Sequence, residues 1–258
     1  MPVEDLPETK IRGWTRVQTA PPLDRANVHV WAAALGEIDP GIARVLVADE
    51  RERAARFRFA ADRERYTRSH AWMRVLLGSY LRRDPRAIVL SISPFGKPLA
   101  VSRGEDERLE FNLSHSGDVA LLAVGADRPV GVDVEEIRAD RVSEDVARRF
   151  FSRVEVDDLL RLSAADRAEA FFRCWTRREA YVKARGEGLS RRLDRFAVSL
   201  GRGEAPDLRP CGEGEEDAIL WSLKSLAPRP GYEGAVAAEG KDWTLRRLTA
   251  APALLTTF

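Results

Sequence analysis

The sequence has no long run of hydrophobic residues. Its longest clearly apolar stretches, such as VALLAVG at 119–125, have the length of a β-strand, whereas a membrane-spanning helix needs about 20 apolar residues. The N-terminal MPVEDLPETKIRGW mixes acidic residues with prolines, unlike the basic start and apolar core of a signal peptide. We therefore expect a soluble, cytoplasmic protein without a membrane partner.

Cysteine and histidine are also scarce. The two cysteines, Cys174 and Cys211, form no CxxC motif, which excludes a disulfide framework and favours a reducing compartment. The three histidines, His29, His70 and His115, are too far apart in sequence for a zinc-binding pattern. No structural zinc or disulfide is therefore expected.

Neither sign of charge is in excess. The chain has 42 Lys and Arg against 41 Asp and Glu, a net charge of +1, so overall charge gives no attraction to nucleic acid. Glycine-rich phosphate loops are missing as well: there is no GxGxxG, and SPFGKP at 93–98 lacks the Walker spacing. Any site for an anionic ligand must come from local clusters of residues.

Hydrophobic periodicity predicts two α+β halves in the 258 residues. In the first half we expect a strand at 27–34, helices within 40–83, and strands at 108–114, 118–125 and 129–136. In the second half we expect helices at 146–162 and 168–186, a polar loop at 202–217, and strands at 195–200, 218–226, 232–240 and 242–248. The repeated order suggests a duplication with its boundary near residue 131, and pockets favour such boundaries.

The stretch GVDVEEI at 131–137 carries acidic residues in an apolar strand. If Val132 and Val134 point into a core, Asp133 and Glu135 share the opposite face. Two carboxylates that close together repel each other unless a positive charge lies between them. The stretch is therefore either a solvated strand face or one side of a cation site.

A third carboxylate lies on the most regular helix. Trp175, Glu179 and Lys183 are spaced four apart and so share one helix face. Taken alone, this pattern fits a core tryptophan beside a solvent-exposed ion pair. Together with Asp133 and Glu135, Glu179 completes the oxygen-rich set that Mg²⁺ prefers, with Lys183 facing phosphates on the ligand.

Two further segments fit a phosphate ligand. NLSHSG at 112–117 places Ser114, His115 and Ser116 in a predicted turn between strands, where the histidine could also simply stabilise the turn. An arginine-rich segment follows residue 50, and although most of its side chains should be solvated, one or two could bind a phosphate in bidentate fashion. Its members are Arg51, Arg53, Arg56, Arg58, Arg63 and Arg65.

Four motifs in order, with FGKP upstream of them at 95–98, resemble the signature of the 4′-phosphopantetheinyl transferases. The match is to the long, two-lobed type typified by the surfactin-synthetase activating enzyme. The motifs are FNLSHSG at 111–117, GVDVEEI at 131–137, RRFFSRVE at 148–155 and FFRCWTRREAYVKARGEGLS at 171–190. The resemblance runs from about Arg51 to Leu200.

The resemblance implies a pseudo-duplicated α+β fold with the active site between two lobes. Residues 1–130 would form the N-terminal lobe, with 1–26 unplaced, and residues 131–258 the C-terminal lobe, carrying most metal-site residues. It also implies an enzyme that moves the 4′-phosphopantetheine arm of coenzyme A onto a serine of an apo carrier protein and releases 3′,5′-ADP. The expected carriers serve nonribosomal peptide, polyketide or fatty-acid synthases, and the expected assembly is a monomer.

The family's functional residues map onto matching positions. Asp133, Glu135 and Glu179 resemble the ligands of Mg²⁺, for which Mn²⁺ could substitute. Asp133 and Glu179 also count with Lys183 as catalytic residues, Glu179 as the general base, directly or through water, and Lys183 as the group that stabilises the breaking pyrophosphate. The residues that resemble coenzyme A contacts are Arg53, Arg65, Gly96, Lys97, Pro98, Ser114, His115 and Lys183.

The sequence departs from the family pattern at a few positions. Arg178 replaces the lysine of the family's W-x-x-K-E-A helix, and Glu50 stands where a basic residue is usual, so that Arg51 could compensate. Glu155 resembles an acid near the metal.

Two other functions fit parts of the pattern. A Mg²⁺-dependent nuclease also uses paired strand acids, but Ile137 stands where such a site has lysine, and the near-neutral charge argues against nucleic acid as a partner. A non-catalytic, carrier-binding homologue would be marked by a lost metal carboxylate, and all three are present.

Overall fold

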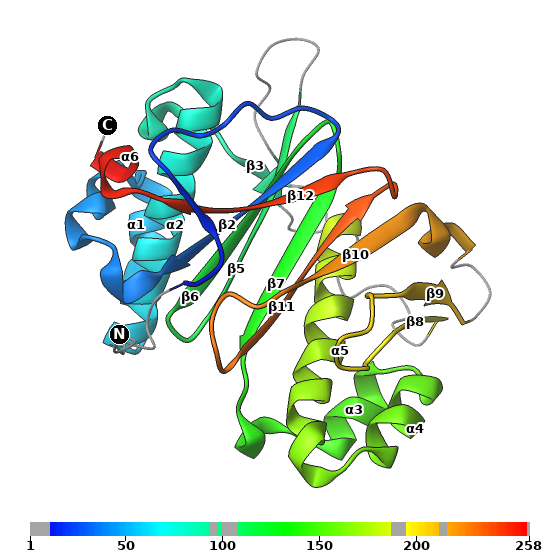
Figure 1. Ribbon diagram of the computed structural model, residues 1–258. Coiled ribbons are helices and arrows are strands. Elements are labelled where there is room, and N and C mark those ends of the chain that lie inside the picture. Colours follow the sequence, from blue (N-terminus) through cyan, green and yellow to red (C-terminus); the bar gives the residue numbers. More distant parts are fainter. Residues whose placement is uncertain (1–10, 93–97, 100–107, 187–194, 212–215, 257–258) are drawn as a thin grey trace, which may run out of the picture.

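The computed structural model describes residues 11–92, 98–99, 108–186, 195–211 and 216–256, arranged as two sheets with long helices outside them (Figure 1). The strands are β1 Thr15–Val17, β2 Asn27–Ala34, β3 Ser91–Ile92, β4 Pro98–Leu99, β5 Leu109–Ser116, β6 Val119–Ala126, β7 Val130–Glu136, β8 Phe196–Val198, β9 Leu208–Pro210, β10 Trp221–Leu226, β11 Tyr232–Glu239 and β12 Thr244–Ala250. The α-helices are α1 Ala48–Ala55, α2 Ala60–Leu81, α3 Glu144–Phe150, α4 Arg153–Arg161, α5 Ala164–Arg185 and α6 Pro252–Thr256.

The two main sheets differ in size, with five strands in one and three in the other. One sheet has the strand order β1-β12-β2-β6-β5 and the other the order β10-β11-β7. Strand β12, near the C-terminus, lies between β1 and β2 and is parallel to both. The lobe boundary near residue 131 stays a prediction. Strand β12 follows this boundary in sequence but belongs to the sheet that is otherwise formed by strands before the boundary.

The layers are helix, sheet, sheet and helix. Along β6, Leu122 and Val124 face α2 while Leu121 and Ala123 face the second sheet, because successive strand side chains point to opposite faces. This burial on both faces explains why β6 is apolar throughout, where a half-exposed strand would alternate. No helix in the described ranges is long and apolar enough to cross a membrane.

Most of the predicted elements are present. The strands expected at 27–34, 118–125 and 129–136 correspond to β2, β6 and β7, and the expected helices correspond to α1 through α5. Two expectations were wrong. Ser114 to Ser116 belong to β5 and pair with β6, so the turn contains only Gly117, at φ +53°, and Asp118. The predicted loop at 202–217 contains β9, which pairs with β8.

Candidate active site at the junction of the two sheets

Strand β7 forms one side of the site, with the alternation that the sequence predicts. Val132 and Val134 are fully buried between the two sheets, where each side chain contributes about 1.5–3 kcal/mol of hydrophobic stabilisation. Asp133 and Glu135 point to the other face, toward α5, and Asp133 is only 3% exposed. A solvated strand face is therefore excluded for Asp133, which lies in a covered site.

A glycine lets helix α5 approach this strand. A Cβ on Gly131 would lie 2.2 Å from the carbonyl oxygen of Ala180 and 2.2 Å from the backbone nitrogen of Ala184, distances that no real Cβ tolerates. The small side chains of α5 and the missing side chain of Gly131 together bring the helix backbone onto β7. As a result, Glu179 and Lys183, on the half-exposed face of α5, lie over the carboxylates of β7. Gly131 was missed as a functional position, although the glycine that opens GVDVEEI was visible in the sequence.

Lys183 and Asp133 form the centre of the site. The Lys183 Nζ lies 2.5 Å from Asp133 Oδ1 and donates to Ser114 Oγ at 3.2 Å. The Ser114 hydroxyl in turn donates to Asp133 Oδ1 at 2.8 Å. Burial disfavours the charged form of Lys183, but the Asp133 carboxylate outweighs that effect and raises the pKa of the ammonium above its usual value.

The other two carboxylates differ in how they are held. Glu135 Oε2 accepts a hydrogen bond from Ser116 Oγ at 2.7 Å, whereas no described residue donates to the Glu179 carboxylate. Burial raises the pKa of both glutamates, and the charge of Asp133 raises each further. Asp133 therefore repels both glutamates, as the sequence predicts for Asp133 and Glu135, which lie close together on one strand face.

The donor set fits a hard divalent cation. Asp133 Oδ2 is buried and has no hydrogen-bond partner, an arrangement that is costly unless a ligand fills it. Carboxylate oxygens are the ligands that Mg²⁺ prefers. Among the residues described, however, no three Asp, Glu, His or Cys side chains lie close enough together to form a finished metal cage, so the three acids are neighbours rather than a preassembled site.

His115 lies on the opposite face of β5 from Ser114, because it is the next residue along a strand. The residue is exposed at the surface but its ring is partly surrounded by protein atoms, and this partial desolvation, together with the charges of Lys183 and Arg65, lowers its pKa. The two neighbouring residues therefore contact different groups. Ser114 bonds to the carboxylate of Asp133, and His115 lies beside α2, which carries Arg65 and His70.

A run of aromatic contacts extends from His70 to Arg53. The rings of Tyr66 and His70 stack with centroids 3.8 Å apart, and the guanidinium of Arg53 lies 5.7 Å from the centroid of Tyr66. Burial lowers the pKa of His70 to about 4, and the nearby charges of His115 and Arg53 act in the same direction. Arg53, Arg65 and His115 thus lie in one neighbourhood of basic residues near Lys183, in which Arg65 is paired with Asp62 at 3.1 Å.

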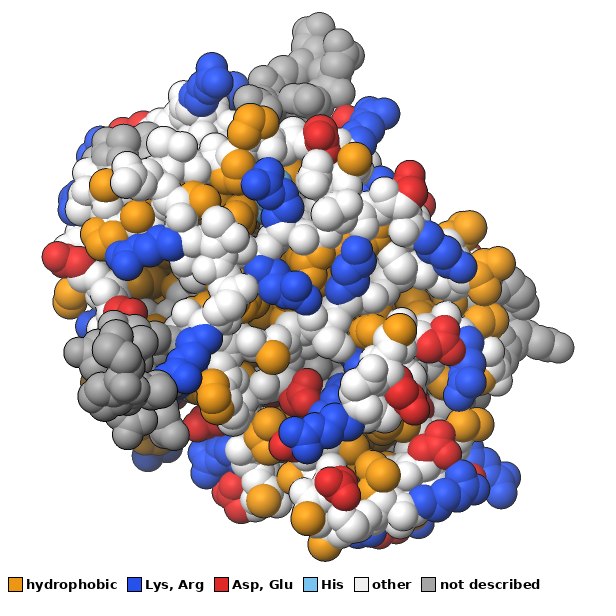
Figure 2. Space-filling view, in the orientation of Figure 1, with side chains coloured by type: hydrophobic (Ala, Val, Ile, Leu, Met, Phe, Trp, Pro, Cys, Tyr) orange, Lys and Arg blue, Asp and Glu red, His pale blue; other side chains and the backbone are white. Residues whose placement is uncertain are grey.

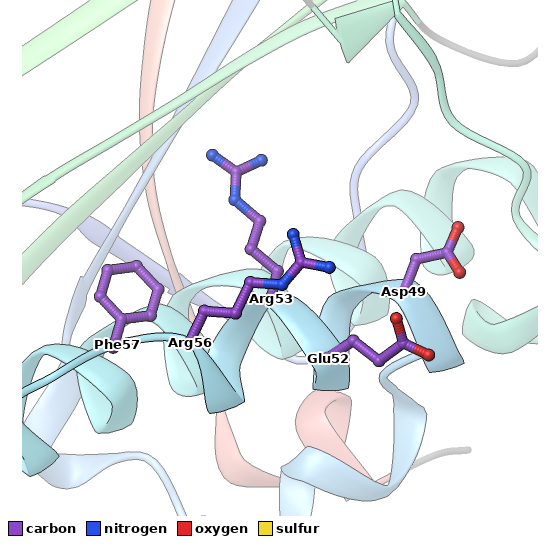
Figure 3. Close-up of a pocket in the computed structure, with 5 residues that line it drawn as sticks. All are labelled: Asp49, Glu52, Arg53, Arg56 and Phe57. Carbon is purple, nitrogen blue, oxygen red and sulfur yellow. The ribbon is translucent and has the colours of Figure 1, made fainter.

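Arg53 also lines a surface pocket of ≈ 580 Å³ at helix α1. Figure 3 shows Arg53 and Arg56 extending from one side of this pocket, with Asp49 and Glu52 nearer the start of the helix and Phe57 beyond its end. The pocket is separate from the carboxylates of β7. Two guanidinium groups, two carboxylates and an aromatic ring line it.

The predicted turn that carries Gly96 and Lys97 lies outside the described residues. Pro98 is the first residue of β4, which pairs with β3, so the backbone of Pro98 belongs to a strand that follows the predicted turn.

The positions that depart from the family pattern have structural partners. Arg178 Nη1 lies 2.5 Å from Glu155 Oε2, both side chains are buried, and Glu155 Oε1 also accepts from the backbone nitrogen of Val198. Glu50 is paired with the buried Arg74 at 2.6 Å. Arg51 donates to the carbonyl oxygen of Leu46, and its compensation for Glu50 stays a prediction.

Both halves of the chain match models of one family. Residues 129–238 match the model of the 4′-phosphopantetheinyl transferase superfamily, and residues 31–127 match the model of the 4′-phosphopantetheinyl transferase N-terminal region. The two matches meet beside β7. The chain belongs to the 4′-phosphopantetheinyl transferase superfamily and to its two-lobed type.

Two sequence relatives agree with this assignment, HetI and Sfp. The chain is 35% identical over 220 residues to the 4′-phosphopantetheinyl transferase HetI of a Nostoc species, covering 84% of this chain and 90% of HetI. It is 30% identical over 201 residues to the 4′-phosphopantetheinyl transferase Sfp of Bacillus subtilis, covering 76% of this chain and 83% of Sfp. A crystal structure of the Thermotoga maritima holo-[acyl-carrier-protein] synthase matches 44% of this chain and 63% of that one, with a TM-score of 0.33 and 23% identity.

Proposed function

We propose that this protein transfers the 4′-phosphopantetheine group of coenzyme A to a serine hydroxyl of an apo carrier protein, in a Mg²⁺-dependent reaction. The observation that carries the proposal is the arrangement of Asp133, Glu135, Glu179 and Lys183 where the two family-matched halves meet. Three neighbouring carboxylates and a lysine beside them suit a pyrophosphate with its metal.

The chemistry assigns different roles to the two side chains of α5. The carrier serine oxygen attacks the β-phosphorus of coenzyme A, and the bond from that phosphorus to the bridging oxygen breaks. Glu179 takes the serine proton, directly or through water, because its carboxylate is not held by another described residue and its pKa is raised toward that of a useful base. Lys183, kept charged by Asp133, stabilises the negative charge on the departing 3′,5′-ADP.

Asp133, Glu135 and Glu179 would hold the metal. When bound, Mg²⁺ supplies Lewis-acid polarisation of the phosphate oxygens and neutralises part of their charge. The unpartnered Oδ2 of Asp133 is the atom of this chain best suited to contact it. A water-filled site without the cation would leave three carboxylates in mutual repulsion.

The basic neighbourhood beside the site would bind the other phosphates of coenzyme A. His115 and Arg65 are the proposed contacts of the 3′-phosphate, and Arg53 is a further phosphate contact beside Tyr66. Ser114 supports this region from the opposite face of β5, since its hydroxyl is bonded to Asp133 and Lys183.

The two other functions fit less well. A nuclease needs a continuous basic surface for its substrate, whereas the face shown in Figure 2 carries both signs of charge. A non-catalytic homologue would not need a retained carboxylate set or the ion pair between Lys183 and Asp133.

The test is intact mass spectrometry of apo carrier proteins incubated with the protein and coenzyme A, with and without Mg²⁺. Peptide-synthetase, polyketide and fatty-acid carriers would be compared, because all three are candidate partners. We expect a Mg²⁺-dependent mass gain of one phosphopantetheine, and we expect Glu179→Gln to reduce the rate at least 100-fold. Glu169→Gln changes a half-buried glutamate on the same helix, paired with Arg173; it is the matched control and should retain activity. Failure to modify any carrier or to bind coenzyme A would overturn the proposal.

A further inference from the structure

Two sheet edges face each other at the active site. Strand β5 is the last strand of the first sheet, and β7 is the last strand of the second. In the part of the chain that the structure describes, no backbone ladder joins β5 to β7, although the two strands lie in close contact. Open edges carry unpaired backbone groups and need partners of some kind.

Three polar side chains of β5 make hydrogen bonds across this junction, to backbone nitrogens and to carboxylates of β7. Asn112 Oδ1 accepts from the backbone nitrogen of Val132 at 2.9 Å. Two residues on, Ser114 Oγ donates to Asp133 at 2.8 Å. After another two, Ser116 Oγ donates to Glu135 at 2.7 Å. We call Asn112, Ser114 and Ser116 the polar zipper; its bonds advance along both strands in the same direction.

We propose that the polar zipper positions the metal-binding carboxylates, holding Asp133 and Glu135 in fixed orientations across the junction of the two sheets. This inference rests on the proposed function, since it concerns the same site. It assigns a role to Asn112 and Ser116, which no part of the proposed reaction uses, and it makes Ser114 a link within the protein as well as a neighbour of the ligand.

The other partner of each serine hydroxyl decides where its proton points. A serine hydroxyl has one proton to donate. Ser116 Oγ accepts from the backbone nitrogen of Glu136 at 3.1 Å, so its own proton is directed to Glu135. Ser114 Oγ accepts from Lys183, so its proton is directed to Asp133. Each serine therefore fixes one carboxylate oxygen and leaves the other free to face a ligand.

The third carboxylate has no such support. Neither serine contacts Glu179, whose carboxylate is held by no described residue. The site thus combines two carboxylates bonded to strand β5 with one that accepts no hydrogen bond from the described residues. This division matches the proposed roles, in which all three carboxylates would hold the cation and Glu179 would in addition take the serine proton.

Ser116→Ala is the decisive variant, because Ser116 is outside the proposed reaction and has no other role in the argument. The probe is Mn²⁺ as a spectroscopic substitute for Mg²⁺, with its dissociation constant measured by electron paramagnetic resonance in the absence of coenzyme A and carrier. Removing the hydroxyl should weaken Mn²⁺ binding about 10–100-fold, the usual effect of losing a group that orients a metal ligand. Ser116→Thr keeps the hydroxyl on a strand-compatible side chain and should bind Mn²⁺ within about threefold of the wild type.

A structural control separates positioning from stability. Ser222 is a strand serine whose hydroxyl donates to Gly240 and accepts from Trp243, away from the carboxylates. Ser222→Ala should lower the melting temperature while leaving the Mn²⁺ dissociation constant unchanged. Asn112→Ala provides a second zipper variant, and it should weaken Mn²⁺ binding in the same direction as Ser116→Ala.

The outcomes distinguish this inference from the proposed function. If the wild type binds Mn²⁺ and modifies carriers but Ser116→Ala binds Mn²⁺ equally well, the zipper has no positioning role and only this inference fails. Equal losses in Ser116→Ala and Ser116→Thr would also overturn it, because the hydroxyl would not be the cause. If the wild type neither binds Mn²⁺ nor modifies a carrier, both the proposed function and this inference fail.

Discussion

Replacing Gly131 with alanine tests how the active site is assembled. The added Cβ would lie 2.2 Å from two backbone atoms of α5 and 2.8 Å from the Cα of Ala184. None of these atoms belongs to a flexible side chain that could turn away. The helix or the strand must therefore move as a body, and Glu179 and Lys183 move with the helix.

The expected magnitude follows from these distances. A contact of 2.2 Å must widen by about 1 Å to become tolerable, and overpacking of this kind costs about 1–3 kcal/mol. For a chain of this length, that cost lowers the melting temperature by roughly 2–10 °C. A displacement of about 1 Å at catalytic groups can lower the rate about 100-fold. We therefore expect a large loss in the rate of carrier modification and only a modest loss in the free energy of unfolding.

The assay is the initial rate of carrier modification, measured by intact mass spectrometry, together with thermal unfolding by circular dichroism. Gly234→Ala is the matched control: Gly234 is in the neighbouring strand β11, and its added Cβ would lie 3.1 Å from the nearest atom. It should change both measurements much less than Gly131→Ala. A Gly131→Ala protein with an unchanged rate and an unchanged melting temperature would refute the reasoning.

Three further predictions concern other parts of the molecule. Glu155→Gln should destabilise the protein by about 3–5 kcal/mol in chemical denaturation, because it leaves the buried Arg178 without its counter-charge; a loss below 1 kcal/mol would contradict this. Burial lowers the pKa of His29 from 6.5 to about 4, so the unfolded chain binds the extra proton first and stability should fall by up to about 3 kcal/mol as the pH drops from 6.5 to 4. His29→Gln should flatten that dependence in denaturant titrations, and an unchanged slope would contradict the assignment. His115→Ala should raise the KM for coenzyme A with little change in kcat, and unchanged coenzyme A affinity would contradict its proposed role.

Local patterns predicted the elements that carry the site. The alternation in GVDVEEI correctly placed Val132 and Val134 in a core and Asp133 and Glu135 on the other face, because a strand allows only two faces. The four-residue spacing of Glu179 and Lys183 correctly placed both on one side of a helix. These inferences needed only the geometry of a single element.

The errors arose where distant segments meet. Ser114 to Ser116 were expected in a turn because polar residues commonly mark one, yet here they lie in β5, and Ser114 and Ser116 bond to carboxylates of β7. A sequence signal existed: Asn112, Ser114 and Ser116 are polar at every second position, as in a strand with one polar face. The position of β12 could not be predicted in this way, because its periodicity identifies a strand but not its neighbours.

The return of β12 to the first sheet bears on how the chain folds during synthesis. About 200 residues separate β2 from β12, so their parallel pairing closes a very large loop and forms late. A ribosome adding about 5–20 residues per second takes on the order of ten seconds to go from the end of β6 to the end of β12. During that time one edge of β2 has no strand beside it, which makes the nascent first half a natural client for a chaperone.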